Sequence, residues 1–460
     1  MCKKTYPLIV ILSVLLLVSC GIIRPYKTPE MAKPDLFREV STTDTSTIAT
    51  LHYTEIFKDT ILQKLIKEGI DQNPDLQIAY TRVQQAQAYY LQSGAYLLPT
   101  LNANANVTRS KFSTGQTLGR QNATQYQLGL SSNWEIDVWG KLRSNRRANL
   151  ANFLQSEAGA RAVQTSLISS IATFYYTLLS LDQQLAITKQ TVINWDTTVQ
   201  TMRALKEAAT VTEAAVVQSQ AQRYAAEVTI PDLKQQIRET ENALSILLGN
   251  APSAISRGSL QEQQTIAVLQ TGIPSQLLSN RPDVQAAELN FRYAFELTNV
   301  ARAYFYPSLV ITGNAALSSF NLSTFFRSGS IAASIAAGLT QPILNQRTNR
   351  TRLDVAKAQQ QEALINFQKT LLTAGQEVSN AISLYNTSQE KITIRSNEIE
   401  ALQKSVDYSQ ELLRNGFANY TEVITARQSL LQAQLGQVND HLQQLQAVVN
   451  LYRSLGGGWR

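Results

Sequence analysis

Hydrophobic and polar residues alternate in four short stretches of this chain. Over residues 100–109, leucine, alanine and valine alternate with asparagine and threonine, and residues 126–136, 308–318 and 330–340 have the same period. A period of two predicts β-strands with one apolar and one polar face. Each stretch is about 10 residues long, the length of a tilted strand that crosses a bilayer. We therefore expect four membrane-crossing strands, although hairpins of a soluble protein would alternate in the same way.

Two much longer stretches have a helical pattern. Residues 141–205 and 348–414 contain no proline, and their apolar positions recur every seven residues, as in the row Leu178, Leu185, Val192 and Val199. A sustained heptad repeat predicts helices packed as coiled coils, and 65 residues would span about 100 Å. A return helix is expected after each of them, and Pro231 should kink the first one.

One block of sequence occurs twice in the chain. Pro282 lies 208 residues after Pro74, and Pro307 lies 208 residues after Pro99. Each copy has a helical pattern between its two prolines and an alternating pattern after the second. We therefore expect an internal two-fold repeat, with a first structural repeat over 59–250, a linker over 251–274 and a second repeat over 275–460.

The N-terminus has the features of an export signal. Lys3 and Lys4 precede an apolar run that ends at Leu17-Val18-Ser19-Cys20. This predicts a signal peptide over 1–19, too short to span a membrane, and its ending resembles a bacterial lipobox, which would make Cys20 the lipidated first residue. An ordinary signal peptide with an incidental cysteine is the alternative. Prolines and a Ser/Thr run over 20–58 predict an extended tether or a disordered segment.

Composition excludes several functions. The formal net charge of +7, two units of which come from Lys3 and Lys4, is too small to indicate a basic nucleic-acid-binding surface. After removal of the signal, Cys20 is the only cysteine, so neither a disulfide nor a thiolate metal site is expected. His52 and His441 have no catalytic or ligand partner at a useful spacing, and no phosphate loop, zinc-protease motif or serine elbow occurs. We expect no enzyme activity, no cofactor and no metal site.

Four strands are too few to close a barrel, and open sheet edges are not tolerated in lipid. The strands should therefore be shared among copies of the chain, and three copies would supply an even number, twelve. Aromatic residues at the expected strand ends fit an interfacial girdle: Tyr96, Trp134, Trp139, Tyr304 and Tyr306.

The order of these motifs resembles TolC-like outer-membrane factors, and most closely the lipidated OprM-type channels of multidrug efflux. The resemblance is carried by Cys20, Pro74-Asp75, Pro282-Asp283, two Tyr-x-x-Pro-x-Leu strand entries and the turn Trp134–Lys141. It implies a mixed α and β membrane protein: a homotrimer with a twelve-stranded outer-membrane barrel continuous with a periplasmic coiled-coil tunnel of twelve helices. The linker would lie in an equatorial belt around the tunnel.

The resemblance also implies a function and partners. It favours a passive exit duct that a periplasmic membrane-fusion adaptor protein and an inner-membrane RND transporter load with small molecules. The alternative is the duct of a type I protein secretion system. A coiled-coil lipoprotein without a pore is a third possibility, and it would show no conductance. Cargo selection is expected to lie with the pump.

The tunnel should end at two helix turns, near 206–213 and 414–422, where related channels carry a gate. At the second turn the chain keeps the family's Gly416 and Tyr420. The acid common in the family is replaced by Thr425, and the base by Gln428, with Arg427 one place earlier. That step rotates the positive charge by about 100° around a helix.

An acid remains nearby as Glu422, and Arg414 could meet it across the second turn. At the first turn, Ala209 and Ala215 stand where a glycine and an aspartate are common in the family. We therefore expect a closed tip held more by packing and uncharged hydrogen bonds than by an ionic lock. The alternative is that Gly416 only ends a helix and Thr425 is only solvated.

Overall fold

The computed structural model describes residues 22–29, 36–37, 46–111, 122–264, 272 and 276–460. The chain forms two compact units, and each takes segments from both sequence repeats. The first, here the strand unit, contains Met1–Glu30, Arg82–Glu157 and Ala286–Gln368. The second, here the helical unit, contains Met31–Thr81, Ala158–Gln285 and Lys369–Arg460. The compact units therefore differ from the repeats that the duplicated motifs define.

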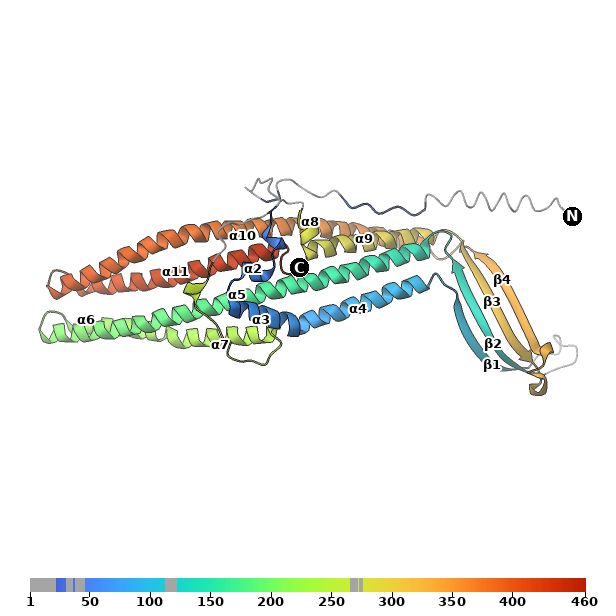
Figure 1. Cartoon of the computed structure of the whole chain (residues 1–460), viewed down its shortest axis with the longest axis horizontal. Helices are drawn as coiled ribbons and strands as arrows, with labels where there is room; N and C mark the ends of the chain where they lie inside the picture. The colour runs from blue at the N-terminus through green and yellow to red at the C-terminus, as the bar shows by residue number, and fades with distance from the viewer. Residues whose placement is uncertain (1–21, 30–35, 38–45, 112–121, 265–271, 273–275) are drawn as a thin grey trace. The chain divides into compact units, whose positions relative to one another are not determined.

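The strand unit contains one antiparallel sheet of four strands in chain order (Figure 1). The strands are β1 (Thr100–Lys111), β2 (Asn122–Ile136), β3 (Ser308–Ser319) and β4 (Ile331–Thr340). The first and last strands are the two edges of this sheet. Sheets with exposed edges are ready to pair with another strand.

The register of the sheet keeps apolar residues on one face. Leu128 lies opposite Leu317, and Leu309 lies opposite Leu339. On the other face, the Asn104 side-chain amide donates to Ser131 Oγ at 2.8 Å. The sequence alternation is therefore continuous across all four strands, because a slip of one residue would have mixed the two faces.

Two strands extend beyond their expected ends. β1 continues to Lys111 instead of stopping at 109, and β2 begins at Asn122 instead of 126. Four of these extra residues pair with each other, Lys111 with Asn122 and Ser110 with Ala123. Apart from Ala123 the extension consists of polar residues, which carry no hydrophobic alternation for the sequence to reveal.

Two helices of 67 residues dominate the chain, α5 (Lys141–Glu207) and α10 (Thr348–Arg414). At 1.5 Å per residue each would be about 100 Å long. The other described helices of eight residues or more are α3 (Thr60–Gln72), α4 (Pro74–Ala95), α6 (Glu213–Glu227), α7 (Thr229–Leu247), α9 (Pro282–Ala303) and α11 (Tyr420–Ser454). In the part of the chain that the structure describes, none of the helices is both long and apolar enough to be a membrane-spanning candidate.

Both duplicated Pro-Asp motifs begin a helix. α4 begins at Pro74 and α9 begins at Pro282. Asn73 caps α4, since its side-chain oxygen accepts from the backbone N–H of Leu76 at 2.9 Å. Proline is well suited to the first helical position, where its missing N–H would have no partner in the helix.

The first return helix is interrupted at one residue. α6 ends at Glu227 and α7 begins at Thr229, so the break falls at Val228, three residues before Pro231. Pro231 then lies in the first turn of α7, where a backbone N–H has no helical acceptor. The expected effect of this proline is therefore present, but it acts on the residues that precede it.

The N-terminal tether contains more helix than expected. Its described part includes the 3-10 turn η2 (Ile48–Thr50) and the short helix α2 (Tyr53–Ile56). The side chain of Thr47 caps the first, accepting from Ala49 N at 3.2 Å, and the side chain of His52 caps the second. Short capped turns of this kind have no periodic pattern that a sequence can show.

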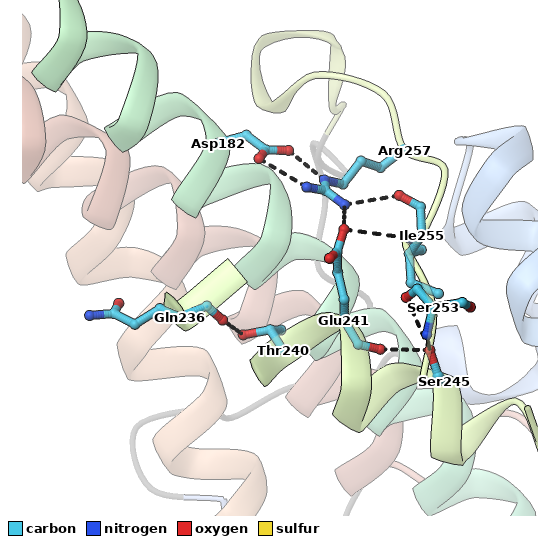
Figure 2. A network of polar contacts seen from close by, with 8 residues as sticks. All are labelled: Asp182, Gln236, Thr240, Glu241, Ser245, Ser253, Ile255 and Arg257. Atoms are coloured by element: carbon cyan, nitrogen blue, oxygen red, sulfur yellow. Dashed lines mark hydrogen bonds and ion pairs between the residues drawn. The ribbon is translucent and has the colours of Figure 1, made fainter. Parts of the chain in front are cut away.

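One arginine holds the linker to two helices of the helical unit (Figure 2). The Arg257 guanidinium binds both carboxylate oxygens of Asp182 on α5, with one nitrogen–oxygen distance of 3.0 Å. It also donates to Glu241 of α7 at 2.5 Å and to the carbonyl of Ile255 at 2.9 Å. The side chains of Arg257 and Glu241 are each only 15% exposed. This clamp ties the linker to both helices.

Candidate functional site

The two helix turns close in the same way. At the first, Ala209 N donates to Lys206 O and Thr210 N donates to Leu205 O, at 2.9 and 2.8 Å. At the second, Gly416 N donates to Leu413 O at 3.1 Å, and Phe417 N to Leu412 O at 2.8 Å. This pair of bonds is the Schellman motif, which places one residue in the left-handed region.

The left-handed residue differs between the turns. Gly416 has φ of +77°, and Ala209 has φ of +56°. Glycine adopts this conformation without cost, whereas the Cβ of alanine is crowded there. The sequence comparison with the family pointed to Ala209, but only the structure shows that this alanine is in the left-handed region.

A hydrophobic cluster next to the two turns joins the helical hairpin α5–α6 to the helical hairpin α10–α11. Its buried members are Met202, Ala215, Val216, Leu413 and Val423. Tyr420 packs against this cluster and also against a second one, formed by Trp195, Ala226 and Ile424. Tyr420 and Ala215 are therefore packing residues in this chain.

Arg414 and Glu422 have separate partners and do not meet across the second turn. Arg414 lies 4.0 Å from Glu411, one turn back on its own helix. Glu422 completes a capping box at the start of α11, where its carboxylate accepts from Asn419 N at 3.5 Å. Within the described residues the predicted contact between Arg414 and Glu422 is absent. The reason is that the helix start uses the Glu422 carboxylate.

The first turn carries an ion pair that the sequence analysis missed. Lys206 near the end of α5 binds Glu213 at the start of α6, and both side chains are about half exposed. Exposed pairs of this kind contribute about 0–1 kcal/mol. The signal was available, because a lysine and a glutamate flank the turn at these positions.

Arg427 has an uncharged partner. With the Gln410 amide oxygen turned toward it, that oxygen accepts from Arg427 Nε at 3.1 Å. Burial lowers the pKa of Arg427, and the nearby carboxylate of Asp407 opposes that effect. Arg427 thus faces α10 within its own chain. A small cavity of about 40 Å³ adjoins it, lined by Thr197, Thr198, Thr201, Met202, Gln410, Leu413, Arg414, Val423 and Arg427.

The last two predicted positions are also placed. Thr425 is exposed on α11. Gln428 donates from its amide to the side-chain oxygen of Gln222 on α6 at 2.5 Å, which links the two hairpins. Gln222 and Gln410 were missed, because a glutamine on a polar helix face has no distinguishing pattern. Cys20 lies outside the described residues, and its lipidation stays a prediction.

Comparison with known proteins identifies the family. The family model described as "Outer membrane efflux protein" matches residues 65–250 and 273–457. The chain belongs to the outer membrane efflux protein family.

Individual members of the family align over nearly the whole chain. The "Solvent efflux pump outer membrane protein SrpC" of Pseudomonas putida is 30% identical over 408 residues, covering 88% of this chain and 87% of SrpC. The "Probable outer membrane lipoprotein SilC" of Salmonella typhimurium is 26% identical and covers 98% of both chains. The solved outer-membrane channel OprN superposes with a TM-score of 0.89 at 26% identity, covering 96% of this chain and 100% of that one.

These findings confirm the expected family, fold class and outer-membrane location. This member of the outer membrane efflux protein family is an efflux channel component, and the family is one of channels, not an enzyme class.

Proposed function

We propose that this chain forms the passive exit duct of a tripartite efflux pump. In this proposal three copies assemble into a twelve-stranded barrel and a twelve-helix tunnel. A periplasmic adaptor and an inner-membrane RND transporter deliver small molecules to the tunnel. The names of relatives such as SrpC, an efflux pump outer membrane protein, support the pump context.

The observation that carries the proposal is the sheet. One of its faces is largely apolar on all four strands, and β1 and β4 are each paired on one side only. In lipid, each unpaired backbone group would cost several kcal/mol, so β1 of one copy must pair with β4 of the next. The apolar face then turns toward lipid and the polar face toward the lumen.

The polar face also fits a duct with little selectivity. Between Asn102 and Thr108 on β1 it presents asparagine and threonine, and Gln125, Ser131 and Asn133 continue it on β2. The acid at its end, Glu135, binds Lys141 at 2.5 Å. A lumen of neutral hydrogen-bonding groups would repel neither cations nor anions strongly, as expected when selection is made by the pump.

Edge pairing can be tested by cross-linking. A cysteine in place of Asn106 on β1 would be combined in one chain with cysteines placed singly along β4, from Ala332 to Gly338. We expect at least one combination to give a disulfide-linked trimer in the outer membrane. The matched control places the first cysteine at Gln127 of the central strand β2. Disulfides that form only within a single chain, and never between chains, would contradict the shared barrel.

The pump assignment has its own test. Deleting the gene should raise sensitivity to small toxic compounds, and complementation should restore resistance. Loss of a secreted protein without any change in resistance would instead support a type I secretion duct.

A further inference from the structure

The loop between β3 and β4, residues 320–330, exposes large apolar side chains. Three of them are 52%, 63% and 79% exposed: Phe320, Leu322 and Phe326. Charge is scarce around them, since Arg327 is the only charged residue in the sequence from 303 to 346. Apolar side chains gathered in this way on a short loop mark a contact surface.

Hydrogen bonds hold the loop in one fold. Its first part is the 3-10 turn η5 (Leu322–Thr324). The hydroxyls of Ser319 and Thr324 are 2.7 Å apart, and Ser330 Oγ donates to the Thr324 carbonyl at 2.8 Å. Phe325 is buried, and its ring stands edge-on to that of Phe326 at 5.0 Å between centroids. An ordered turn therefore presents the exposed side chains.

Ser319 shows which side of the sheet the loop covers. It pairs with Tyr126 in the ladder, and its side chain shares a face with Leu317, two residues before it. That face is the apolar one, on which Leu317 lies opposite Leu128. The contact between the Ser319 and Thr324 hydroxyls forms on the same side. The turn η5 thus folds toward the apolar face of the sheet and away from the polar face.

The position of the loop along the sheet matches one border of the apolar band of a barrel. Tyr306 lies just before β3, among the aromatic residues at the other end of the sheet. The apolar band is about 25 Å tall, and a strand tilted by about 45° climbs about 2.3 Å per residue, so about 11 residues cross it. This distance leads from Tyr306 to the region of Leu317, and the loop begins just beyond, at Phe320. Among the described strand residues at this end, Tyr126 is the only aromatic one.

We propose that the β3–β4 loop is an outer-leaflet anchor that inserts Phe320, Leu322 and Phe326 into the boundary between acyl chains and head groups, with Thr324 as its positioning residue. Phenylalanine and leucine are typical of segments that bury an apolar face at this boundary. The partner is membrane lipid, because the loop continues the apolar face and turns away from the lumen.

Arg327 adds a polar contact to this anchor. It is exposed and follows Phe326 directly in the sequence. At head-group level its guanidinium can pair with lipid phosphates. The inference rests on the proposed barrel, since only a sheet that crosses the membrane brings the loop to this border.

Spin labels on the full protein in phosphatidylcholine vesicles test the anchor. One label is attached to a single cysteine in Leu322→Cys or Phe326→Cys, and its accessibility to oxygen is compared with that to a water-soluble nickel complex. Oxygen concentrates in hydrocarbon and the complex stays in water, so we expect an oxygen-to-nickel ratio at least about threefold that of a lumen label. The unmodified chain, labelled in parallel, corrects for native cysteines.

Two labels on β3 calibrate the ratio. Asn314→Cys reports the polar face and Leu317→Cys the apolar face of the same strand. Loop labels reached mainly by nickel while Leu317→Cys is reached mainly by oxygen would overturn the anchor and leave the barrel intact. Loop labels reached by neither reagent would assign the loop to a contact between copies, which also overturns it. A nickel-accessible Leu317→Cys would contradict the barrel itself, and the anchor with it.

Thr324→Val tests the contact that folds the loop. Valine keeps the branched shape of threonine and removes the hydroxyl that meets Ser319. We expect the oxygen-to-nickel ratio at position 326 to fall about twofold or more, because the turn loses its tie to the apolar face. Ser323→Ala, at an exposed position of the same turn, is the matched control and should leave the ratio unchanged. An equal ratio in Thr324→Val and in the control would overturn the positioning role of Thr324.

Discussion

Ala209 occupies in the first tip the backbone position that Gly416 occupies in the second. Both follow a 67-residue helix, and both have positive φ. The same closure also ends α7 and α11, where Gly249 and Gly456 have φ of +76° and +89°. Of these four helix ends, the first tip alone uses a residue with a Cβ, so it stores strain that the others avoid.

Replacing this alanine should therefore stabilise the tip. We expect Ala209→Gly to lower the free energy of the closed turn by about 0.5–1 kcal/mol, because relief of the left-handed strain outweighs the added freedom of the unfolded chain. Hydrogen exchange of the backbone amides around residues 205–213 would measure this change in stability. Gly416→Ala should have the opposite effect at the second tip.

Ala208→Gly provides the matched control. Ala208 is not among the residues with positive φ, so glycine there should weaken the helix end. Equal effects of glycine at positions 208 and 209 would show that the left-handed conformation carries no strain.

We expect a closed tip that depends little on ion pairs. Arg427 faces the neutral amide of Gln410, and Glu422 is engaged in a helix cap. We therefore expect Arg427→Ala and Glu422→Ala to change the conductance of the isolated channel by less than about twofold. Losing the cap should cost about 1 kcal/mol of local stability.

Thr425→Asp completes this set of variants. It restores the acid that is common in the family. The position of the matching base is occupied by the neutral Gln428, so conductance should stay near that of the unmodified chain. If either alanine variant opens the channel several-fold, an ionic lock operates and the packing account of the tip is wrong.

The two faces of β3 should respond differently to charge. Ile311 lies opposite Trp134 and Ala337 on the apolar face, whereas Asn314 lies on the polar face. Ile311→Arg should cost about 2–4 kcal/mol of barrel stability near mid-membrane. Asn314→Arg should leave stability nearly unchanged and alter conductance and ion selectivity. Heat-modified mobility of the trimer and single-channel recording would separate these effects, and equal effects at both positions would reject the register.

Much of this architecture was predictable because its patterns are periodic. The alternation on β3 and the heptads of α5 each repeat one physical requirement many times, so single exceptions do not hide them. The duplicated prolines at 74 and 282 placed the helix starts, where a missing N–H has little cost.

Single contacts were not predictable in the same way. Arg414 and Glu422 are near each other in sequence, but the helix cap competes for the carboxylate, and no pattern shows which partner wins. The double hydrogen bond of Asn299 to Arg24 joins residues 275 positions apart. Such a contact depends on how the chain is packed, and an asparagine in a helix gives no sign of it.

The clamp at Arg257 should contribute measurably to stability. Its guanidinium is shared by Asp182 and Glu241, and the carboxylates raise its pKa, so it stays charged. Arg257→Ala would leave both acids without their cation and should cost about 2 kcal/mol, less than a fully buried pair because Asp182 is 39% exposed. Arg257→Lys should recover less than half of the stability that Arg257→Ala loses, since an ammonium cannot bind two carboxylate oxygens in the way a guanidinium does.

Thermal unfolding of the purified protein would measure these changes. Arg238→Ala, at an exposed position of α7, is the control and should have little effect. A stability equal to that of the unmodified chain for Arg257→Ala would show that the linker is held by other contacts.

Single-channel recording of the purified protein in planar bilayers shows directly whether copies of this chain share their strands to form a duct through the outer membrane. We expect discrete conductance steps from an assembly of three copies, and we expect Asn314→Arg to change the size of these steps. A protein that inserts into the bilayer as a single chain, or that gives no conductance steps at all, would contradict it.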